Sequence, residues 1–531
     1  MSLEYNGGPP HGRLLRRGVI QYKNYKERTV NNAYCSNVFR PLAVCVAMLI
    51  VAACGQEDRA PAPAEEAETS AKVPITTSSA EARALYLQGR ALLDDLHFVE
   101  ANEVFIAAVD NDPEFAMGHF MVATTSQTAA EFFDAVAAAA ASKESASEGE
   151  QLYIEALVAA SENNQAEQLD ALKQLVAMYP QDERPHMQLG NYMNGQQDFA
   201  AAVEHYKHAM TINPEFAAAY NALGYAYRSL DDLDNARAAF QEYVRLIPGE
   251  ANPHDSFAEL LMEMGNYDES IEHYRMSLKI DPNFTASYAG INVNYSLMGE
   301  AELAQEAADQ MLAAARNLTE RQAAMFRSVT AHLFAGNTEA AMEVCDTMAA
   351  EAEVKGDHAA VGGAHEYMGD IMLAAGNAAE AERHFNEALD HRLHAEINEA
   401  NKALAERTHM FKTAIAAMIG DNAEAAASLT AEYSAAAEAS GTAFERRRIH
   451  ELAGFLAMFN EDNESAAAHF DQASQLNPVV LYWSAVVNKE LGNTEKAIDL
   501  ATRAANRNTL SGNLPFFRAD ALRLLEELSA G

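Results

Sequence analysis

The side chains best suited to chemistry in this chain of 531 residues are its 17 histidines and 4 cysteines. Two pairs of histidines stand three residues apart, His205 with His208 and His391 with His394. That spacing places both imidazoles of a pair on one face of a helix, where they could hold a metal ion. The simpler interpretation is that these are solvated histidines. We therefore expect no metal and no cofactor.

The motifs of common catalytic sites are missing from the sequence. It contains no H-E-x-x-H zinc motif, no G-x-S-x-G nucleophile elbow, no Walker A loop and no G-x-G-x-x-G loop. Beyond residue 54 one cysteine remains, Cys345, which excludes a disulfide within that part of the chain and predicts a small buried apolar side chain. We expect a protein that is not an enzyme.

The charge of the chain is strongly acidic and unevenly distributed. Its 38 Lys and Arg and 77 Asp and Glu give a net charge of −39 at pH 7. Residues 1–53 carry seven basic and two acidic side chains, which leaves 31 basic and 75 acidic ones, a net of −44, in the rest. Such a surface repels nucleic-acid phosphates, so the expected partners are neutral or basic proteins and peptides.

An uncharged apolar segment, residues 41–53, follows Arg40 and ends in small residues before Cys54. It is shorter than the roughly 20 residues of a membrane-spanning helix and has the length of the apolar region of a signal peptide. Val51-Ala52-Ala53-Cys54 resembles the lipobox of bacterial lipoproteins, in which the cysteine is acylated and becomes the new N-terminus. A signal without lipid attachment, which either anchors the chain in the membrane or is simply cleaved, remains the alternative.

The lipobox resemblance implies a lipid-anchored protein of the bacterial cell envelope. Gly55 follows the cysteine, where an aspartate is associated with inner-membrane retention, so the resemblance points to the outer membrane and to a protein facing the periplasm. About 39 residues precede the apolar segment, more than lipoprotein signals have, which favours a start codon assigned too far upstream. The membrane is then contacted through the lipid alone.

The remaining sequence has a repeat of 34 residues, marked by Pro180, Pro214, Pro248 and Pro282. The segment from Ala219 to Pro248, AYNALGYAYRSLDDLDNARAAFQEYVRLIP, closely resembles the tetratricopeptide repeat. The resemblance implies an all-α fold, a right-handed α-solenoid of antiparallel helix pairs with eleven or twelve repeats. In this family the first helices line a concave groove that binds extended peptides.

Each unit has the same arrangement of small, aromatic and proline residues. A small residue stands where the first helix approaches the second most closely, the second helix carries a small residue and then an aromatic one, and the proline ends the second helix at an N1-like place before the next. The positions that carry this pattern are Gly89, Ala101, Phe105 and Pro113; Gly190, Ala202, Tyr206 and Pro214; Gly224, Ala236, Phe240 and Pro248; Pro282; Gly369, Ala381 and Phe385; and Gly454, Ala466, Phe470 and Pro478.

These patterns divide the chain into five expected segments. They are a signal peptide with its N-terminal extension at 1–53, a lipid-anchored flexible tether at 54–80, an N-terminal repeat array at 81–318, a C-terminal array at 319–512 and a capping helix at 513–531. The tether is rich in Pro, Ala, Ser, Thr and Glu without an apolar period. The boundary after 318 rests on an interrupted repeat register that contains Gly356, Gly362 and Gly363.

The family register points seven polar side chains toward the groove: Arg184, Asn191, Asn221, Tyr225, Arg228, Asp255 and Glu259. The alternative is that these are ordinary solvated positions. The function we expect is a non-catalytic scaffold that binds proteins or peptides for the assembly of envelope complexes. An accessory factor of a polysaccharide or protein export or biosynthesis machine is the second hypothesis. The sequence does not determine the oligomeric state.

The lipobox can be tested by replacing the cysteine. We expect Cys54→Ala to abolish incorporation of radioactive palmitate and to release the protein from the membrane fraction, because no thiol remains to be acylated. Metabolic labelling followed by immunoprecipitation measures this. Labelling that persists in the variant would show that Cys54 is not the acylated residue.

Overall fold

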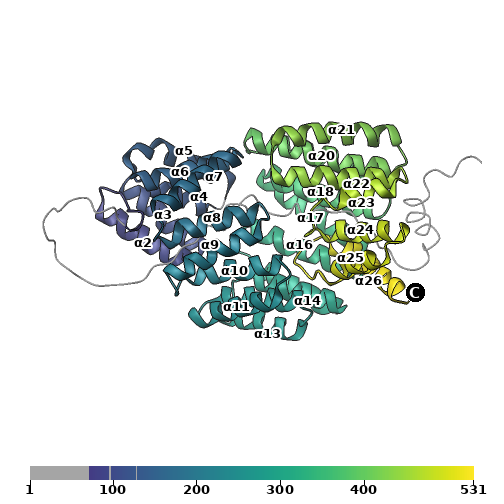
Figure 1. The fold of residues 1–531 in the computed structure, drawn as a ribbon, viewed down its shortest axis with the longest axis horizontal. Coiled ribbons are helices and arrows are strands. Elements are labelled where there is room, and N and C mark those ends of the chain that lie inside the picture. Colours follow the sequence, from purple (N-terminus) through teal and green to yellow (C-terminus); the bar gives the residue numbers. More distant parts are fainter. Residues whose placement is uncertain (1–70, 95–96, 127, 531) are drawn as a thin grey trace, which may run out of the picture. The chain divides into compact units, whose positions relative to one another are not determined.

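The computed structural model describes residues 71–94, 97–126 and 128–530, and within them the fold is all-α (Figure 1). The signal segment, Cys54 and residues 54–70 of the expected tether lie outside these residues. The helices follow one another as twelve pairs and a closing helix: α2 (Ala80–Asp94) and α3 (Phe98–Asn111), α4 (Ala116–Thr125) and α5 (Ala129–Ala141), α6 (Glu148–Ser161) and α7 (Gln165–Met178), α8 (Glu183–Gly195) and α9 (Phe199–Ile212), α10 (Ala217–Ser229) and α11 (Leu233–Leu246), α12 (Ala251–Glu263) and α13 (Tyr267–Ile280), α14 (Thr285–Met298) and α15 (Ala301–Ala314), α16 (Leu318–Phe334) and α17 (Thr338–Lys355), α18 (His358–Ala374) and α19 (Ala378–His394), α20 (Glu399–Ile419) and α21 (Ala423–Ser440), α22 (Ala443–Phe459) and α23 (Asn463–Phe470), α24 (Pro478–Glu490) and α25 (Thr494–Asn506), and α26 (Leu514–Ala530).

The helices form two compact units, which we describe separately. The N-terminal unit comprises the described residues up to 261 together with 268–287, and the C-terminal unit comprises 262–267 and 288–530. Each has its own apolar core between stacked helix pairs. The predicted all-α solenoid of antiparallel helix pairs is confirmed, and the twelve pairs agree with the expected number of repeats. The division after residue 318 stays a prediction.

A contact between a glycine and an aromatic ring joins the two helices of a pair. In the pair α10 and α11, Phe240 is fully buried, and a Cβ atom added to Gly224 would lie 2.7 Å from carbons of its ring. Gly89 meets Phe105, Gly190 meets Tyr206, Gly369 meets Phe385 and Gly454 meets Phe470 in the same way. The glycines therefore stand where the two helices approach most closely, as predicted. The space left by the missing side chain is filled by the aromatic ring of the second helix.

In the described chain, the turns inside ten of the pairs contain a residue in the left-handed conformation, and in seven of them the next residue caps the second helix. Gly376 has φ 71°, and the next residue, Asn377, accepts a hydrogen bond from the backbone N–H of Glu380 in the first turn of α19. Asp231 takes the glycine's place before α11 with φ 59°, and Asp232 caps that helix. Glycine and Asp or Asn tolerate this backbone conformation best, and Asp and Asn also supply the capping oxygen.

The prolines between pairs correct one expectation. Pro478 does stand at the first position of α24 behind the capping residue Asn477. Pro214, however, precedes α10 by three residues, in a turn closed by the N–H of Phe216 on the carbonyl of Asn213 at 3.1 Å. Pro113 and Pro282 precede their helices by the same distance. The fixed φ of proline suits this turn, which redirects the chain between pairs.

The interrupted register between residues 317 and 363 has a local cause. The helices from α16 to α22 are 17 to 21 residues long, whereas those from α8 to α15 are 13 or 14. Gly356 ends α17 in the left-handed conformation, and Gly362 lies within α18, where an added Cβ would come 2.9 Å from the carbonyl oxygen of Ala388. Longer helices and close packing, rather than a linker, account for these glycines.

The contact between glycine and ring predicts a large cost for one methyl group. We expect Gly224→Ala to lower the free energy of unfolding by roughly 1 to 3 kcal/mol, because Phe240 must move in a closely packed core. Gly195→Ala, near the end of α8, is the matched control, since an added Cβ there meets no heavy atom of the described chain within 4 Å. Urea unfolding followed by circular dichroism measures both. Equal midpoints for the two variants would contradict the assigned role of Gly224.

Candidate functional site

All seven polar residues predicted for the groove lie on first helices of the N-terminal unit. They are Arg184 and Asn191 on α8, Asn221, Tyr225 and Arg228 on α10, and Asp255 and Glu259 on α12. Six are half-buried, and the exception is Asp255, which is 8% exposed. Helix α8 contacts α10, and side chains of α10 bind α12, so the faces that carry these residues are neighbours. We call the faces of α8, α10 and α12 that carry the seven residues the first-helix surface.

Three of the seven side chains bind one another. Arg228 Nη1 lies 2.8 Å from Glu259 Oε1, and its guanidinium stands 4.8 Å from the centre of the Tyr225 ring. The Tyr225 hydroxyl donates to Glu259 Oε2 at 3.0 Å. Burial raises the pKa of Tyr225 further above its usual value, so the phenol keeps its proton. These bonds connect α10 to α12, and they hold the Arg228 guanidinium against the ring of Tyr225.

Asp255 does not face the groove as an open carboxylate. The Ser287 hydroxyl lies 2.7 Å from its Oδ1 and 2.8 Å from the Ser277 hydroxyl oxygen. Burial raises the pKa of Asp255 to about 7. A protonated Asp255 can donate to Ser287, which leaves the serine proton for Ser277, so both short contacts are satisfied. The residue belongs to the interior of the stack.

Three of the predicted groove residues carry unused hydrogen-bonding capacity. Arg184 Nη2, Asn191 Nδ2 and Asn221 Oδ1 are buried and have no hydrogen-bond partner in the described part of the chain. Burial and the nearby charge of Arg90 lower the pKa of Arg184. Two donors and one acceptor on neighbouring first helices match the alternating C=O and N–H groups of an extended peptide.

An extended segment of the chain itself, residues 72–78, runs across the starts of three first helices. The backbone N–H groups of Val73, Thr76 and Ser78 donate to the carboxylates of Asp182, Glu150 and Asp112, at 2.9, 2.7 and 3.0 Å respectively. Lys72 adds an ion pair with Glu183 at 2.8 Å. The sequence placed these residues in a flexible tether that ends at 80. The structure instead makes them part of the folded unit.

In each of the three carboxylates, one oxygen accepts a hydrogen bond near the start of a helix and the other accepts one from the extended segment. Asp182 caps α8 with Oδ1 and receives the extended segment with Oδ2. Glu150 completes the capping box of α6 with Oε2 and accepts from Thr76 with Oε1. The chain therefore uses the anion-favouring N-terminal ends of its helices to hold carboxylates that in turn bind an extended backbone.

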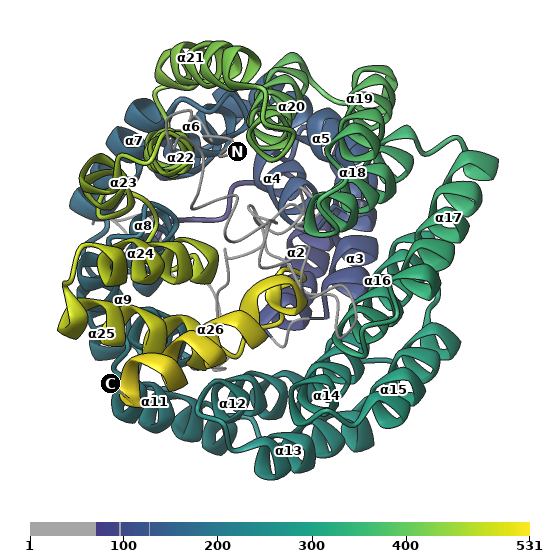
Figure 2. The ribbon, with the colours of Figure 1, turned by 90° about the vertical axis from the view of Figure 1, so that its right-hand side faces the viewer.

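A segment near the C-terminus lies against first helices of the C-terminal unit. Arg327 on α16 donates to the carbonyl of Leu510 at 2.9 Å, and Tyr367 on α18 donates to that of Gly512 at 2.7 Å. Phe516, at the start of α26, joins the core formed by these helices, and Figure 2 shows α26 beside α16. The expected capping helix and the segment before it thus contact the first helices α16 and α18.

The histidines pair between helices rather than along one helix. His205 Nδ1 lies 3.4 Å from His186 Nδ1, and His391 Nδ1 lies 3.1 Å from His358 Nδ1. Histidines three residues apart in the sequence do not indicate these contacts. A spacing of 19 residues, which recurs four times, marks pairs such as His186 with His205, whereas His358 and His391 stand 33 residues apart.

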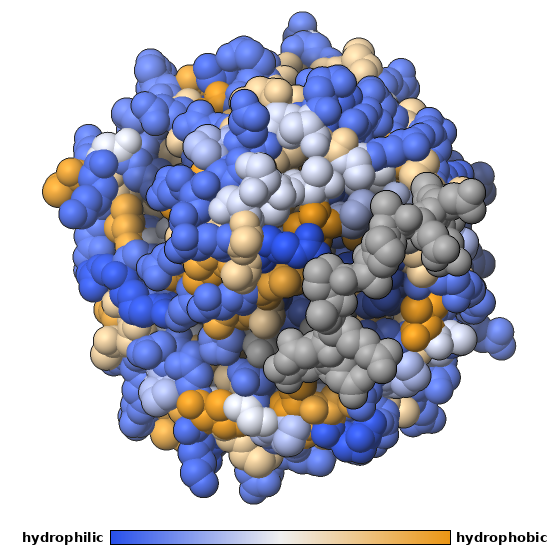
Figure 3. All heavy atoms as spheres, turned by 90° about the vertical axis from the view of Figure 1, so that its left-hand side faces the viewer, coloured by the Kyte–Doolittle hydropathy of each residue, from blue (hydrophilic) through white to orange (hydrophobic). Residues whose placement is uncertain are grey.

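Hydrophilic side chains dominate the face of the molecule in Figure 3, where apolar atoms form small separate patches. This agrees with the excess of acidic residues in the sequence. Among the described residues, no helix combines the length and the apolar character needed to cross a membrane.

The buried carboxyl of Asp255 predicts a dependence of stability on pH. Because its pKa is about 7 in the folded state and about 3.9 in an unfolded chain, the stability that its proton provides is complete below about pH 4 and is lost as the pH rises through 7. Asp255→Asn cannot titrate, so we expect it to gain roughly 1 to 3 kcal/mol relative to the native protein between pH 4 and 8. Urea unfolding of both proteins at several pH values measures the difference. A difference that stays constant with pH would contradict the assignment.

Comparison with known families identifies the repeat. Models of the tetratricopeptide repeat match residues 186–251 and 452–511, and residues 255–284 match a second model of the same repeat. These ranges contain the glycine and aromatic pairs of α8 with α9, α10 with α11, and α22 with α23.

Curated relatives and solved structures are similar over parts of their length. The chain is 30% identical over 94 residues to Hsp70-Hsp90 organizing protein 1 of Glycine max, covering 18% of this chain and 16% of that protein. It is 22% identical over 127 residues to a UDP-N-acetylglucosamine–peptide N-acetylglucosaminyltransferase of Giardia intestinalis, covering 24% of this chain and 9% of the enzyme. The crystal structure of the APC/C hetero-tetramer Cut9-Hcn1 is 14% identical with a TM-score of 0.40, covering 86% of this chain and 79% of that one.

The chain spans less than a fifth of the length of the curated relatives it matches. Matches of this extent carry no enzymatic activity to this chain, and no catalytic domain of the transferase is shown in it. What they share with the family models is the repeat. The stacked helix pairs and the matched segments together identify this chain as an all-α protein that contains tetratricopeptide repeats.

Proposed function

We propose that the protein is a non-catalytic scaffold that binds extended segments of partner proteins on the first-helix surface of its N-terminal unit. The observation that carries this proposal is the capture of residues 72–78, whose backbone N–H groups bind carboxylates of successive repeats. An array that holds an extended backbone of its own chain has the geometry to hold another.

The unused polar atoms on α8 and α10 supply the second part of the argument. Leaving a buried donor or acceptor without a partner costs about 1 to 3 kcal/mol, which a ligand can recover by bonding to it. Arg184, Asn191 and Asn221 offer two donors and one acceptor of this kind. Tyr225 and Arg228 lie on the same surface and add a face on which an aromatic side chain can stack.

The charge of the protein restricts the partners. The net of −44 beyond residue 53 favours neutral or basic proteins and repels polyanions. We further propose that the scaffold works in the bacterial cell envelope, anchored to the outer membrane by lipid on Cys54 and facing the periplasm. The support for this location is the sequence from Arg40 to Gly55. Assembly of envelope complexes is the role that such an anchor suits.

The scaffold is tested by removing unused polar atoms. We expect Asn191→Ala with Asn221→Ala to reduce at least several-fold the partner proteins that co-purify from detergent-solubilised membranes, because both side chains lose bonds that a ligand would make. The free energy of unfolding should fall by no more than about 1 to 3 kcal/mol, since Asn191 Oδ1 accepts from the buried Tyr206 hydroxyl at 2.9 Å. Quantitative mass spectrometry measures the partners, and chemical unfolding measures stability.

The matched control for this experiment lies on a second helix. Asn235→Ala with Gln241→Ala removes two polar side chains that are exposed on α11. It should leave the set of co-purified proteins as it is in the native protein. If the variant in α8 and α10 also retains every partner at native abundance, the first-helix surface is not the binding site.

A further inference from the structure

Histidine pairs connect the two helices of four repeats, and in each pair the residues stand 19 positions apart. The distances between their Nδ1 atoms are 3.4 Å for His186 and His205, 3.1 Å for His254 and His273, 3.2 Å for His365 and His384, and 3.1 Å for His450 and His469. The first histidine precedes the small residue of its helix by four positions, and the second directly precedes the aromatic residue. The close approach of the helices therefore brings the imidazoles together.

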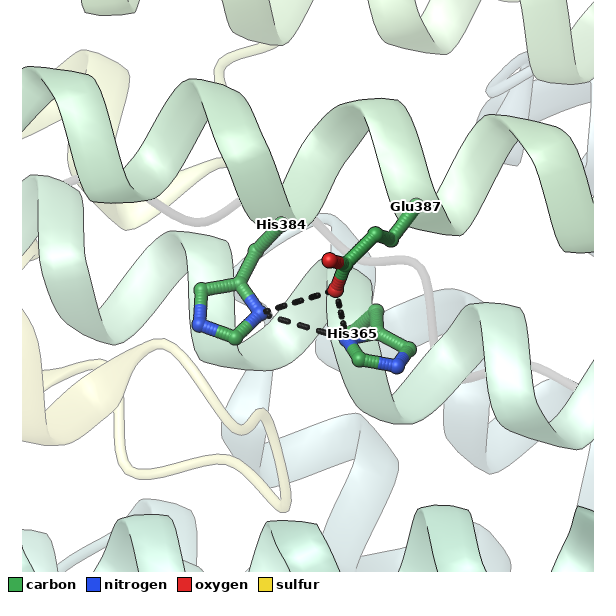
Figure 4. Close-up of side chains that lie close together, drawn as sticks. All are labelled: His365, His384 and Glu387. Carbon is green, nitrogen blue, oxygen red and sulfur yellow. Dashed lines mark hydrogen bonds and ion pairs between the residues drawn. The ribbon is translucent and has the colours of Figure 1, made fainter.

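The residue 22 positions after the first histidine decides what the pair can bind. Three positions after the second histidine, it is His208, Met276 or Glu387 on the same helix in three repeats. In the fourth repeat it is Gln472, in the turn that follows α23. In the pair α18 and α19, Glu387 completes a cluster of three with His365 and His384, whose ligand atoms all lie within 4.8 Å of one another. Figure 4 shows the three side chains converging.

The edges of this cluster match those of a metal site. His365 Nδ1 lies 3.2 Å from His384 Nδ1 and 3.0 Å from Glu387 Oε2, and His384 Nδ1 lies 3.9 Å from the same oxygen. Zn²⁺ binds nitrogen and carboxylate oxygen at about 2.0 to 2.1 Å, so two ligands of a tetrahedral ion stand about 3.3 Å apart. Only the contact between His384 and Glu387 has to shorten.

Protons alone do not satisfy the cluster. Arg383 Nη2 lies 2.9 Å from His384 Nε2, which makes that nitrogen an acceptor and leaves the ring proton on Nδ1. If His384 Nδ1–H donates to His365 Nδ1, the lone pair of Glu387 Oε2 faces the lone pair of His365. If His365 Nδ1 carries a proton for Glu387, two N–H groups face each other. Once the His384 proton moves from Nδ1 to Nε2 and Arg383 turns away, a cation at the centre is attracted by the lone pairs of all three ligand atoms.

The surroundings keep both imidazoles in the form that binds metal. Burial lowers the pKa of His365 and of His384, which disfavours the protonated rings. Glu387 is 40% exposed and His365 19%, which gives an ion access and leaves solvent as a fourth ligand. His391 stacks on His365 with ring centres 6.0 Å apart, which extends the histidines along α19.

We propose that His365, His384 and Glu387 bind Zn²⁺, with water as the fourth ligand, and that the ion fastens α18 to α19. The ligand set of two imidazoles, one carboxylate and one water is typical of Zn²⁺ sites that keep an open position. Arg383, which also binds Glu387 Oε1 at 2.9 Å, competes with the ion and must release the ring of His384 when zinc binds. The site therefore contains its own electrostatic competitor.

Titration of the full chain with ZnCl₂, after treatment with EDTA, tests this proposal. We expect Glu387→Gln to lose one equivalent of zinc, or to bind that equivalent roughly tenfold or more weakly, and to lose the rise in melting temperature that goes with it. Arg383→Gln should tighten the same equivalent. Isothermal titration calorimetry gives the stoichiometry and affinity, and the visible spectrum of Co²⁺ in place of zinc reports tetrahedral coordination.

A second repeat provides a gain-of-function control. His450 and His469 form the same pair, but the third position is Gln472, which is the residue that Glu387→Gln creates in the first cluster. Gln472→Glu should add one equivalent of zinc to the native stoichiometry. Equal stoichiometry and affinity in the native protein, Glu387→Gln and Gln472→Glu would overturn the proposal, and so would the absence of zinc binding to the native chain.

Discussion

The close approach of two helices at a glycine, filled by one aromatic ring, is the contact on which the rest of this structure depends. It recurs in five pairs, from Gly89 with Phe105 to Gly454 with Phe470, and sets the separation of the helices in those pairs. A closely packed core does not adjust to one additional methyl group without strain. Once that separation is set, residues a turn away from the glycine, such as His365 and His384, are brought within bonding distance.

Repeat packing also places polar groups where water cannot fully reach them. First helices are flanked on both sides by neighbours, so their polar side chains are half-buried and must bond to one another or to another chain. Tyr225, Arg228 and Glu259 take the first course. In the C-terminal unit Lys412 and Asp370 do the same, at 2.5 Å, with both side chains almost fully buried. Arg184, Asn191 and Asn221 retain bonding capacity.

First helices of this chain bind two segments of the chain itself. Residues 72–78 lie across the starts of α4, α6 and α8, and residues 510–516 lie against α16 and α18. Carboxylates at or just before the starts of helices hold the first segment, and an arginine and a tyrosine hold the second through its carbonyl groups. The same physical features, helix ends and polar first helices, therefore serve the fold and offer binding sites for an extended backbone.

The sequence by itself determined the helix pairs, their number and their closest contacts, because a period of 34 residues with glycine, alanine and aromatic residues at fixed places reflects local packing between neighbours. It also indicated the turns, where Gly376 and Asn377 have the conformations their types favour. The N-terminal motif and Cys54 lie outside the described residues, so the interpretation of that region still rests on sequence alone.

Only the tertiary structure decided which polar residues meet. The repeat register predicts that Asp255 faces the groove, but its contact with Ser287, 32 positions away, places it in the interior of the stack. The sequence indicates a flexible tether at residues 72–78. Their bonds to Asp112, Glu150 and Asp182 join positions 34 to 109 residues apart, so local sequence does not reveal them. His365, His384 and Glu387 come from two helices and form a cluster through the separation of those helices. Local periodicity encodes a helix and its neighbour, whereas these contacts depend on where each side chain points once the helices are packed.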